Sequence, residues 1–118
     1  MTLATSRLIG RWSRPSRLAA LAVLAAAAPE NAPAVDAARQ ADLVQLVRQD
    51  CGSCHGLTLK GGLGKPLEPA ALAGIDAAGI AEIILSGVPG TPMPPWQGLL
   101  SREDAEWIAA ALKQGLPE

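Results

Sequence analysis

Apolar residues recur at helical spacing in three segments of the chain. The pattern predicts helices over residues 37–50, 77–86 and 101–114, each with one apolar face. No segment alternates apolar and polar residues in the way that a half-buried strand does. The stretches between the helices, residues 56–69 and 88–98, are too rich in glycine and proline to be helical. The pattern therefore predicts a small all-α domain of short helices and long loops.

Capping residues support these boundaries. Asp36 and Asp76 stand where the N-caps of the first and second helices belong, and Ser101 with Asp104 resembles a capping box for the third. A short helical turn is also expected over Pro69–Ala73, because proline is favoured at the first position of a helix.

The N-terminal segment has the character of a secretory signal peptide. Four arginines and no acid precede the apolar run Leu18–Ala28, which fits a signal h-region and is too short to span a bilayer. An A-x-A cleavage site ends at Ala34. We therefore predict a signal peptide over residues 1–34 and a mature domain over residues 35–118. A cut at the end of the apolar run, or an alanine-rich globular helix in its place, are the alternatives.

Charge and composition narrow the class of protein. Cleavage after Ala34 leaves 84 of the 118 residues, with six Lys and Arg against ten Asp and Glu, a net charge of −4. An acidic exported protein of this size is not expected to bind nucleic acid. The mature part has two tryptophans and no Phe or Tyr. A domain this small with so few aromatic side chains needs a disulfide, a metal or a bound cofactor for stability.

The sequence Cys51-Gly52-Ser53-Cys54-His55 is a C-x-x-C-H motif, which is typical of covalent haem attachment. Two thiols with this spacing can each form a thioether to one haem vinyl group, and the adjacent histidine then lies under the iron. A structural disulfide and a thioredoxin-like dithiol are alternatives, although the latter expects a βαβ setting. A zinc site is a third, but the mature chain has too few Cys and His for about four ligands.

Met93 is the candidate for the second axial ligand of the iron. His55 is the single histidine, and the other methionine, Met1, belongs to the predicted signal peptide. Prolines on both sides of Met93 restrict the backbone, so the loop can present the sulfur with little loss of entropy. The alternatives are that Met93 fills a gap in the core, or that Lys60, Lys65, water or an open position takes its place.

From about Asp36 to Leu116 the chain resembles a class I c-type cytochrome. The resemblance rests on the order of its parts: an N-terminal helix, C-x-x-C-H, a glycine-rich loop, a short middle helix, a proline-flanked methionine and a C-terminal helix with an aromatic. The stretches LVRQDCGSCHGLTLKGGLG and GTPMPPW are most similar to small periplasmic cytochromes associated with dissimilatory nitrite reductase in denitrifying bacteria. The resemblance implies the class I cytochrome c fold, short helices packed around one covalently bound haem c, and a periplasmic location.

The resemblance also implies roles for single residues. Cys51 and Cys54 match the thioether cysteines of the family, His55 the proximal ligand and Met93 the distal ligand. His55 and Met93 are therefore the expected metal ligands, and all four residues are expected to bind the cofactor.

The loop after the motif departs from the family pattern. The family usually has Gly-Pro there, with a nearby carbonyl that accepts the imidazole N–H, whereas this chain has Gly64-Lys65-Pro66. We expect the carbonyl of Lys65 or of its neighbour to take that role and to raise the basicity of the imidazole. Lys60 and Lys65 should border the haem, where they either steer an acidic partner or are simply solvated.

Two tryptophans remain to be placed. Trp107 matches the aromatic of the family's C-terminal helix and should pack on the first helix against Leu43, Leu46 or Val47. Trp96 follows the methionine loop, and either gives its indole N–H to a haem propionate or is a partly exposed loop aromatic.

These observations favour an electron carrier rather than an enzyme. With both axial positions filled by protein, no position on the iron is left for a substrate. The resemblance implies nitrite reductase, or an enzyme that builds its specialised haem, as redox partner, and monomer is the expected oligomeric state. The alternatives are a haem protein with a labile distal ligand that acts as a small-ligand sensor or enzyme, and an exported helical domain without redox activity.

A haem would also supply the missing core. We expect it to be surrounded by eight apolar residues, and the chain without it to be poorly folded. These residues are Leu63, Leu67, Ile80, Ile83, Ile84, Val88, Leu99 and Ile108.

Overall fold

The computed structural model describes residues 35–118, and in this part of the chain all regular structure is helical. The elements are α1 (Ala37–Leu46), η1 (Val47–Cys51), α2 (Gly52–His55), α3 (Ala77–Ser86) and α4 (Arg102–Gln114). The predicted all-α class is thereby confirmed. Among these helices, none is long and apolar enough to cross a membrane. The predicted signal peptide lies outside the described residues.

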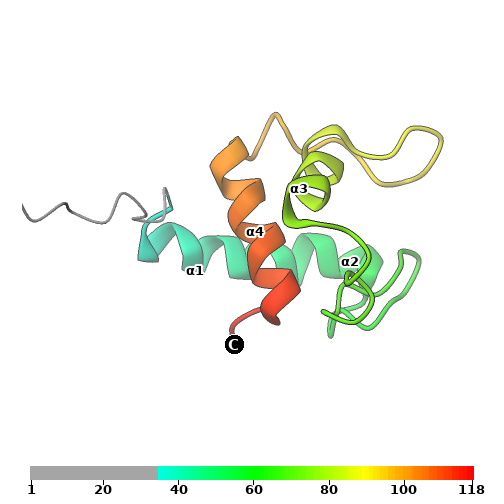
Figure 1. Ribbon diagram of the computed structural model, residues 1–118, viewed down its shortest axis with the longest axis horizontal. Helices are drawn as coiled ribbons and strands as arrows, with labels where there is room; N and C mark the ends of the chain where they lie inside the picture. Colours follow the sequence, from blue (N-terminus) through cyan, green and yellow to red (C-terminus); the bar gives the residue numbers. More distant parts are fainter. Residues whose placement is uncertain (1–34) are drawn as a thin grey trace, which may run out of the picture. The chain divides into compact units, whose positions relative to one another are not determined.

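The first three elements follow one another without a break (Figure 1). Asp36 begins this long helix as predicted, because its Oδ1 accepts a hydrogen bond of 2.8 Å from the N–H of Arg39. The predicted end at residue 50 is too early, since the helix continues through the whole C-x-x-C-H motif to His55. The turn Val47–Cys51 is a π-helix, a form that occurs frequently at functional sites.

The other two helices have the predicted positions. The N-cap Asp76 accepts a hydrogen bond of 2.7 Å from the N–H of Gly79, which opens α3. Ser101 and Asp104 form the predicted capping box at the start of α4. α3 and α4 lie side by side (Figure 1). Fully buried alanines on both helices allow this close approach, namely Ala81, Ala105 and Ala109.

The core lies where α4 crosses the long helix (Figure 1). Leu43 and Val47 of the long helix and Ile108 of α4 are the largest fully buried side chains in the described part. Burial of three such side chains contributes several kcal/mol of hydrophobic stabilisation, at roughly 1.5–3 kcal/mol each. The two ends of the described part are thereby joined in one core.

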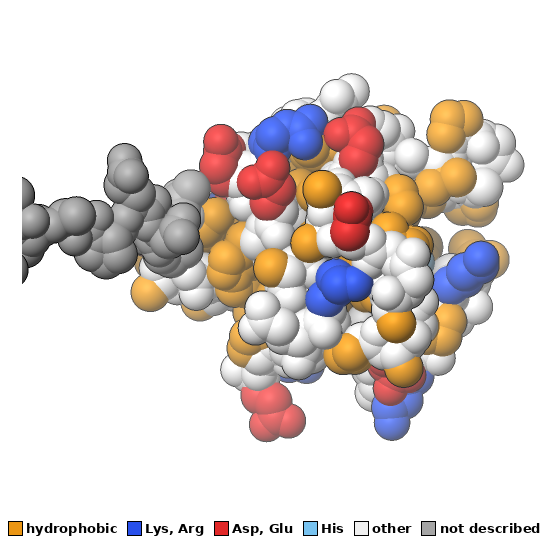
Figure 2. Space-filling model, viewed as in Figure 1, with side chains coloured by type: hydrophobic (Ala, Val, Ile, Leu, Met, Phe, Trp, Pro, Cys, Tyr) orange, Lys and Arg blue, Asp and Glu red, His pale blue; other side chains and the backbone are white. Residues whose placement is uncertain are grey.

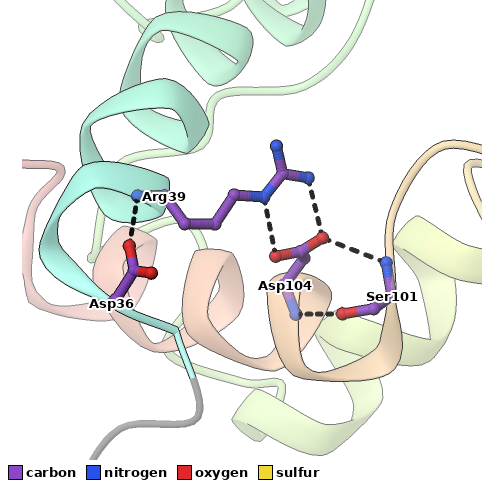
Figure 3. A network of polar contacts seen from close by, with 4 residues as sticks. All are labelled: Asp36, Arg39, Ser101 and Asp104. Atoms are coloured by element: carbon purple, nitrogen blue, oxygen red, sulfur yellow. Dashed lines mark hydrogen bonds and ion pairs between the residues drawn. The ribbon is translucent and has the colours of Figure 1, made fainter.

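A polar network fixes the same crossing from outside (Figure 3). The guanidinium of Arg39 donates two hydrogen bonds to the buried carboxylate of Asp104, from Nε at 3.1 Å and from Nη2 at 2.8 Å. Asp104 also accepts the N–H of Ser101, and the Ser101 hydroxyl accepts the N–H of Asp104. These hydrogen bonds, with that of Arg39 foremost, hold the pKa of Asp104 below its ordinary value. The Asp104 carboxylate in turn raises the pKa of Arg39.

The segment between α2 and α3 is irregular, as its glycines and prolines predict. The expected helical turn at Pro69–Ala73 occurs as hydrogen-bonded turns over residues 69–74 rather than as a helix. Lys113 of α4 donates hydrogen bonds from Nζ to the carbonyls of Leu72 and Ile75. The last helix therefore supports this loop as well as α1 and α3.

Candidate haem-binding site

The two cysteines lie on one face at the end of the long helix. Cys51 is the last residue of η1 and Cys54 lies in α2, so their three-residue separation places them one helical turn apart. Both thiols are free and partly buried. Burial, with a smaller contribution from the neighbouring Asp50 carboxylate, raises the pKa of Cys51 to about 11. The Cys51 thiol is therefore protonated at neutral pH.

The imidazole of His55 is oriented by the backbone of the following loop. Its Nδ1 lies 2.6 Å from the carbonyl oxygen of Lys65. A carbonyl only accepts hydrogen bonds, so Nδ1 carries a proton, and in the neutral imidazole Nε2 keeps a free lone pair. The sequence left open whether the carbonyl of Lys65 or that of its neighbour accepts this N–H, and in the structure it is the carbonyl of Lys65. A neutral imidazole held in this way is the form that binds a metal.

Gly64 makes room for that imidazole. A Cβ built on Gly64 would lie 2.7 Å from both Cε1 and Nδ1 of His55, closer than van der Waals contact permits. Any other residue at this position would displace the ring. Sequence reasoning did not single out Gly64, although the cluster of glycines after the motif was a signal that side chains are excluded there.

The loop also satisfies the carbonyls at the end of α2. The N–H of Gly61 donates to the His55 carbonyl and the N–H of Gly64 to the Cys54 carbonyl, each at 2.8 Å. These hydrogen bonds replace those that a continuing helix would make. Gly56 has a φ of 90°, and a Cβ there would lie 2.5 Å from the Gly61 carbonyl oxygen. The backbone alone thus forms a close-fitting support around His55.

Met93 lies in a loop that is attached to the C-terminal end of α3. The loop returns to α3 through hydrogen bonds from Trp96 N–H to the Ile84 carbonyl, 3.1 Å, and from Gln97 N–H to the Leu85 carbonyl, 3.2 Å. Met93 itself is half-buried.

Gly87 allows the methionine loop to approach α3. It has a φ of 66°, and a Cβ there would lie 2.7 Å from the Pro94 carbonyl carbon and 2.8 Å from the Met93 carbonyl oxygen. The structure thus assigns to Gly87 a packing role that the sequence analysis missed.

Apolar side chains are exposed around these two loops, and this surface fits a large apolar cofactor. Two of them follow the motif, two flank the methionine loop, and two lie beside or on α3. Figure 2 shows hydrophobic side chains over the part of the face where the green and yellow loops of Figure 1 lie. A soluble protein seldom leaves such a surface uncovered. The exposed residues are Leu57, Leu63, Ile75, Ile83, Val88 and Leu99.

The residues predicted to surround the haem differ in exposure. Ile80, Ile84 and Ile108 are buried in the protein's own core and leave little surface for a cofactor. Leu67 is half-buried against the same core. Leu63, by contrast, is 78% exposed. Leu63 stays a candidate for cofactor contact, as do the other exposed residues of the predicted set, Ile83, Val88 and Leu99.

Trp96 and Trp107, the two tryptophans of the described part, are half-buried against the core that includes Leu43 and Val47. Trp107 also lines a surface hollow together with Ala41 and Val44 of α1. Its contact with Leu43, Leu46 or Val47 in particular stays a prediction. The role of the Trp96 indole stays a prediction.

A second hollow is lined by residues outside the motif. Its lining includes Arg48, Leu59 and Leu116, whereas Cys51, His55 and Met93 do not line either hollow. Lys60 and Lys65 are exposed, as expected.

Known proteins resemble this chain over nearly all of the described part. A family model described as "Cytochrome C oxidase, cbb3-type, subunit III" matches residues 38–110. A protein named cytochrome c55X from Paracoccus denitrificans is 56% identical over 94 residues, which cover 80% of this chain and 90% of that protein. A protein of the same name from Pseudomonas aeruginosa is 55% identical over 80 residues, 68% of this chain and 67% of the relative.

Two further similarities extend this picture. A solved structure of the "c-type cytochrome NirC" superposes with a TM-score of 0.67 at 54% identity, over 69% of this chain and 95% of that one. A Pseudomonas aeruginosa protein named dihydro-heme d1 dehydrogenase is 39% identical over 72 residues, 61% of this chain but 15% of that protein.

Proposed function

Because this chain belongs to the c-type cytochrome family, whose members carry covalently bound haem c, we propose that it is a periplasmic electron carrier. Cys51 and Cys54 would form the thioethers to the haem, and His55 and Met93 would bind its iron. When bound, haem c supplies an iron that takes up and releases one electron. The observation that carries the proposal is the orientation of His55, with Nδ1 on the Lys65 carbonyl and Nε2 free.

The residues of this chain have three tasks in that function. The hydrogen bond from Nδ1–H makes the imidazole of His55 a better electron donor, which favours the ferric state. The Met93 thioether is a soft ligand and favours the ferrous state. The exposed apolar side chains around the two loops keep water from the cofactor. The balance of the two ligands makes both oxidation states accessible.

The covalent attachment is tested by cysteine variants in cells that mature c-type cytochromes. We expect Cys51→Ser and Cys54→Ser each to lose one thioether, and the double variant to lose all haem on acid–acetone extraction. Ser53→Ala is the matched control, because Ser53 lies between the two cysteines and its hydroxyl contacts the Asp50 carbonyl. Full haem retention in the double cysteine variant would contradict the proposed attachment.

The axial ligands are tested by optical spectroscopy. The ferric protein should show a methionine-to-iron charge-transfer band that Met93→Ala removes. The unaltered ferrous protein should not bind carbon monoxide readily. Ready binding would instead favour a sensor or enzyme with a labile distal ligand.

We propose that the pathway served is denitrification, either as electron donor to nitrite reductase or in the maturation of its specialised haem. The names of the relatives support this. A dehydrogenase must pass the electrons it removes to an acceptor, and a segment similar to this chain occurs within the much longer protein named dihydro-heme d1 dehydrogenase. A separate cytochrome of the same kind is suited to accept or relay such electrons.

The two roles predict opposite directions of electron flow. Stopped-flow mixing of the ferrous protein with oxidised nitrite reductase tests the first. Mixing of the ferric protein with the reduced haem-maturation enzyme tests the second. Both are measured against ionic strength, since a rate that falls with salt shows electrostatic steering. Transfer to neither partner would contradict the proposed pathway.

A further inference from the structure

The segment 64–67 is fixed at three successive points around the C-x-x-C-H motif. The N–H of Gly64 donates to the Cys54 carbonyl at 2.8 Å, and the N–H of Leu67 donates to the Leu59 carbonyl at 2.9 Å. Between them the Lys65 carbonyl accepts the imidazole Nδ1–H. Residue 66, which lies between the Lys65 carbonyl and the Leu67 N–H, is a proline and has no N–H of its own.

The ring of this proline, Pro66, packs over Gly61. A Cβ built on Gly61 would lie 3.3 Å from Cγ and 3.4 Å from Cδ of Pro66. Gly61 is the residue whose N–H donates to the backbone carbonyl of His55. Pro66 therefore lies close to the residue that fixes the backbone of His55. It is also covalently bonded to the carbonyl that fixes the imidazole.

Proline also restricts the residue that precedes it. A residue before proline is confined to extended backbone, because the proline Cδ clashes with the α conformation. This restriction falls on Lys65, the residue whose carbonyl points at His55. Alanine at position 66 would release it, and would add an N–H that needs a partner at a half-buried position.

We propose that Pro66 is a positioning residue for His55, since it holds the Lys65 carbonyl on the imidazole Nδ1–H and thereby lowers the reduction potential. The inference rests on the proposed function, in which His55 is an iron ligand. A firm hydrogen bond from Nδ1–H makes the imidazole more basic and stabilises the ferric state. A looser bond therefore favours the ferrous state.

The test uses the holoprotein with Pro66→Ala. In the ferrous, diamagnetic state, solvent exchange of the His55 Nδ1–H is measured by NMR, and the reduction potential is measured by optical titration. We expect exchange to be faster by roughly fivefold or more, the factor for loss of a typical net hydrogen-bond contribution. The equilibrium constant for reduction should rise by about twofold to fivefold, because the imidazole becomes less basic. A merely structural role would lower stability without moving the potential in this direction.

Two controls separate the contributions. Pro69→Ala removes an exposed proline of the next turn and should leave exchange and potential unchanged. Lys65→Ala keeps both the carbonyl and the proline after it, so the exchange of Nδ1–H should stay within about twofold of the unaltered protein if the backbone is responsible. Values for Pro66→Ala equal to those for Pro69→Ala would overturn the proposal.

The thioethers retain the haem, so a destabilised variant can still be measured. If Pro66→Ala is unfolded by circular dichroism, Pro66→Val replaces it, since valine favours extended backbone at position 66 itself and still releases Lys65. It should change both quantities in the same direction, and unchanged values would overturn the proposal. Failure of the proposed function is distinguishable, because the unaltered ferrous protein would then lack the strongly ring-current-shifted His55 ring signals of an iron ligand.

Discussion

The loops that carry the two proposed iron ligands are held in different ways. Around His55, backbone groups of the loop 56–67 make the hydrogen bonds described, and Gly64 leaves no space beside the ring. The Met93 loop is attached instead to the end of α3, through Gly87 and the N–H groups of Trp96 and Gln97. The histidine is thus fixed locally, whereas the methionine depends on a neighbouring helix. Changes near each ligand should therefore have different consequences.

The largest effect is expected for Gly64→Ala. The new Cβ overlaps the imidazole, so we expect the free energy of unfolding to fall by about 3 kcal/mol, at the upper end of the usual overpacking penalty. Urea denaturation of the holoprotein measures it, with Gly98→Ala as control, because a Cβ on Gly98 meets nothing within 4 Å. Equal stability of the two variants would show that His55 is not held as described.

Gly87→Ala should have a smaller and more specific effect. Backbone strain at positive φ and overlap with the methionine loop should together cost about 2 kcal/mol and weaken the ferric charge-transfer band of Met93. Gly90→Ala is the matched control, since Gly90 has a φ of 77° in the same loop but a Cβ there meets nothing within 4 Å. If Gly87→Ala and Gly90→Ala weaken the band equally, backbone strain alone explains the loss. The close contact between Gly87 and the methionine loop would then have no part in it.

Asp104→Asn tests the crossing of α1 and α4, on which both loops depend. Losing the charge of the Asp104–Arg39 pair should lower the free energy of unfolding by about 1 kcal/mol at pH 7, allowing for solvent around Arg39. The surroundings of His55 and of Met93 should be affected equally. The pKa of Asp104 is lowered in the folded protein. Its contribution is therefore present above the ordinary pKa near 3.8 and is lost as the pH falls through the lower folded value.

Urea denaturation from pH 7 down to pH 2 checks this dependence. The difference in stability between Asp104→Asn and the unaltered protein should shrink below about pH 4. Glu103→Gln changes an exposed neighbour in the same turn and serves as control. A difference that grows in acid would contradict the assigned pKa direction.

The smallest effect is expected for Thr91→Val. The Thr91 hydroxyl donates to the Val88 carbonyl at 2.7 Å and accepts the N–H of Met93 at 3.3 Å. Loss of these exposed bonds should cost about 0.5 kcal/mol and speed the replacement of Met93 by imidazole in the ferric protein, measured by stopped flow. Thr58→Val, at an exposed position in the other loop, should leave that rate unchanged.

The helix boundaries were predictable where side chains mark them. Asp36, Asp76 and Ser101 cap their helices through their own oxygens, so residue type alone identifies them. The π turn at Val47–Cys51 was not predictable, because its residues are equally compatible with an ordinary helix. The pattern also could not separate Ile80 and Ile84, which are buried, from Ile83, which is exposed, since all three are apolar residues of one helix.

In the site, too, the sequence identified the functional side chains but not the backbone contacts that hold them. Cys51, Cys54, His55 and Met93 follow from reactive side chains and their spacing, and their role as ligands stays a prediction. The acceptor for His55 is a backbone carbonyl, which every residue possesses, so the sequence narrowed it to Lys65 or a neighbour. The contact between Gly61 and Pro66 depends on loop geometry and leaves no signal in either residue alone.

The crossing of α1 and α4 has a consequence for the order of folding. Arg39 and Asp104 are 65 residues apart in the chain, and Leu43 and Val47 share a core with Ile108. An exported chain that crosses the membrane N-terminus first presents the first half of this core before the second half. Because contacts between distant residues form late, the N-terminal part should stay unfolded until translocation is nearly complete. The cysteines at the end of the long helix would then remain accessible to covalent modification until α4 docks.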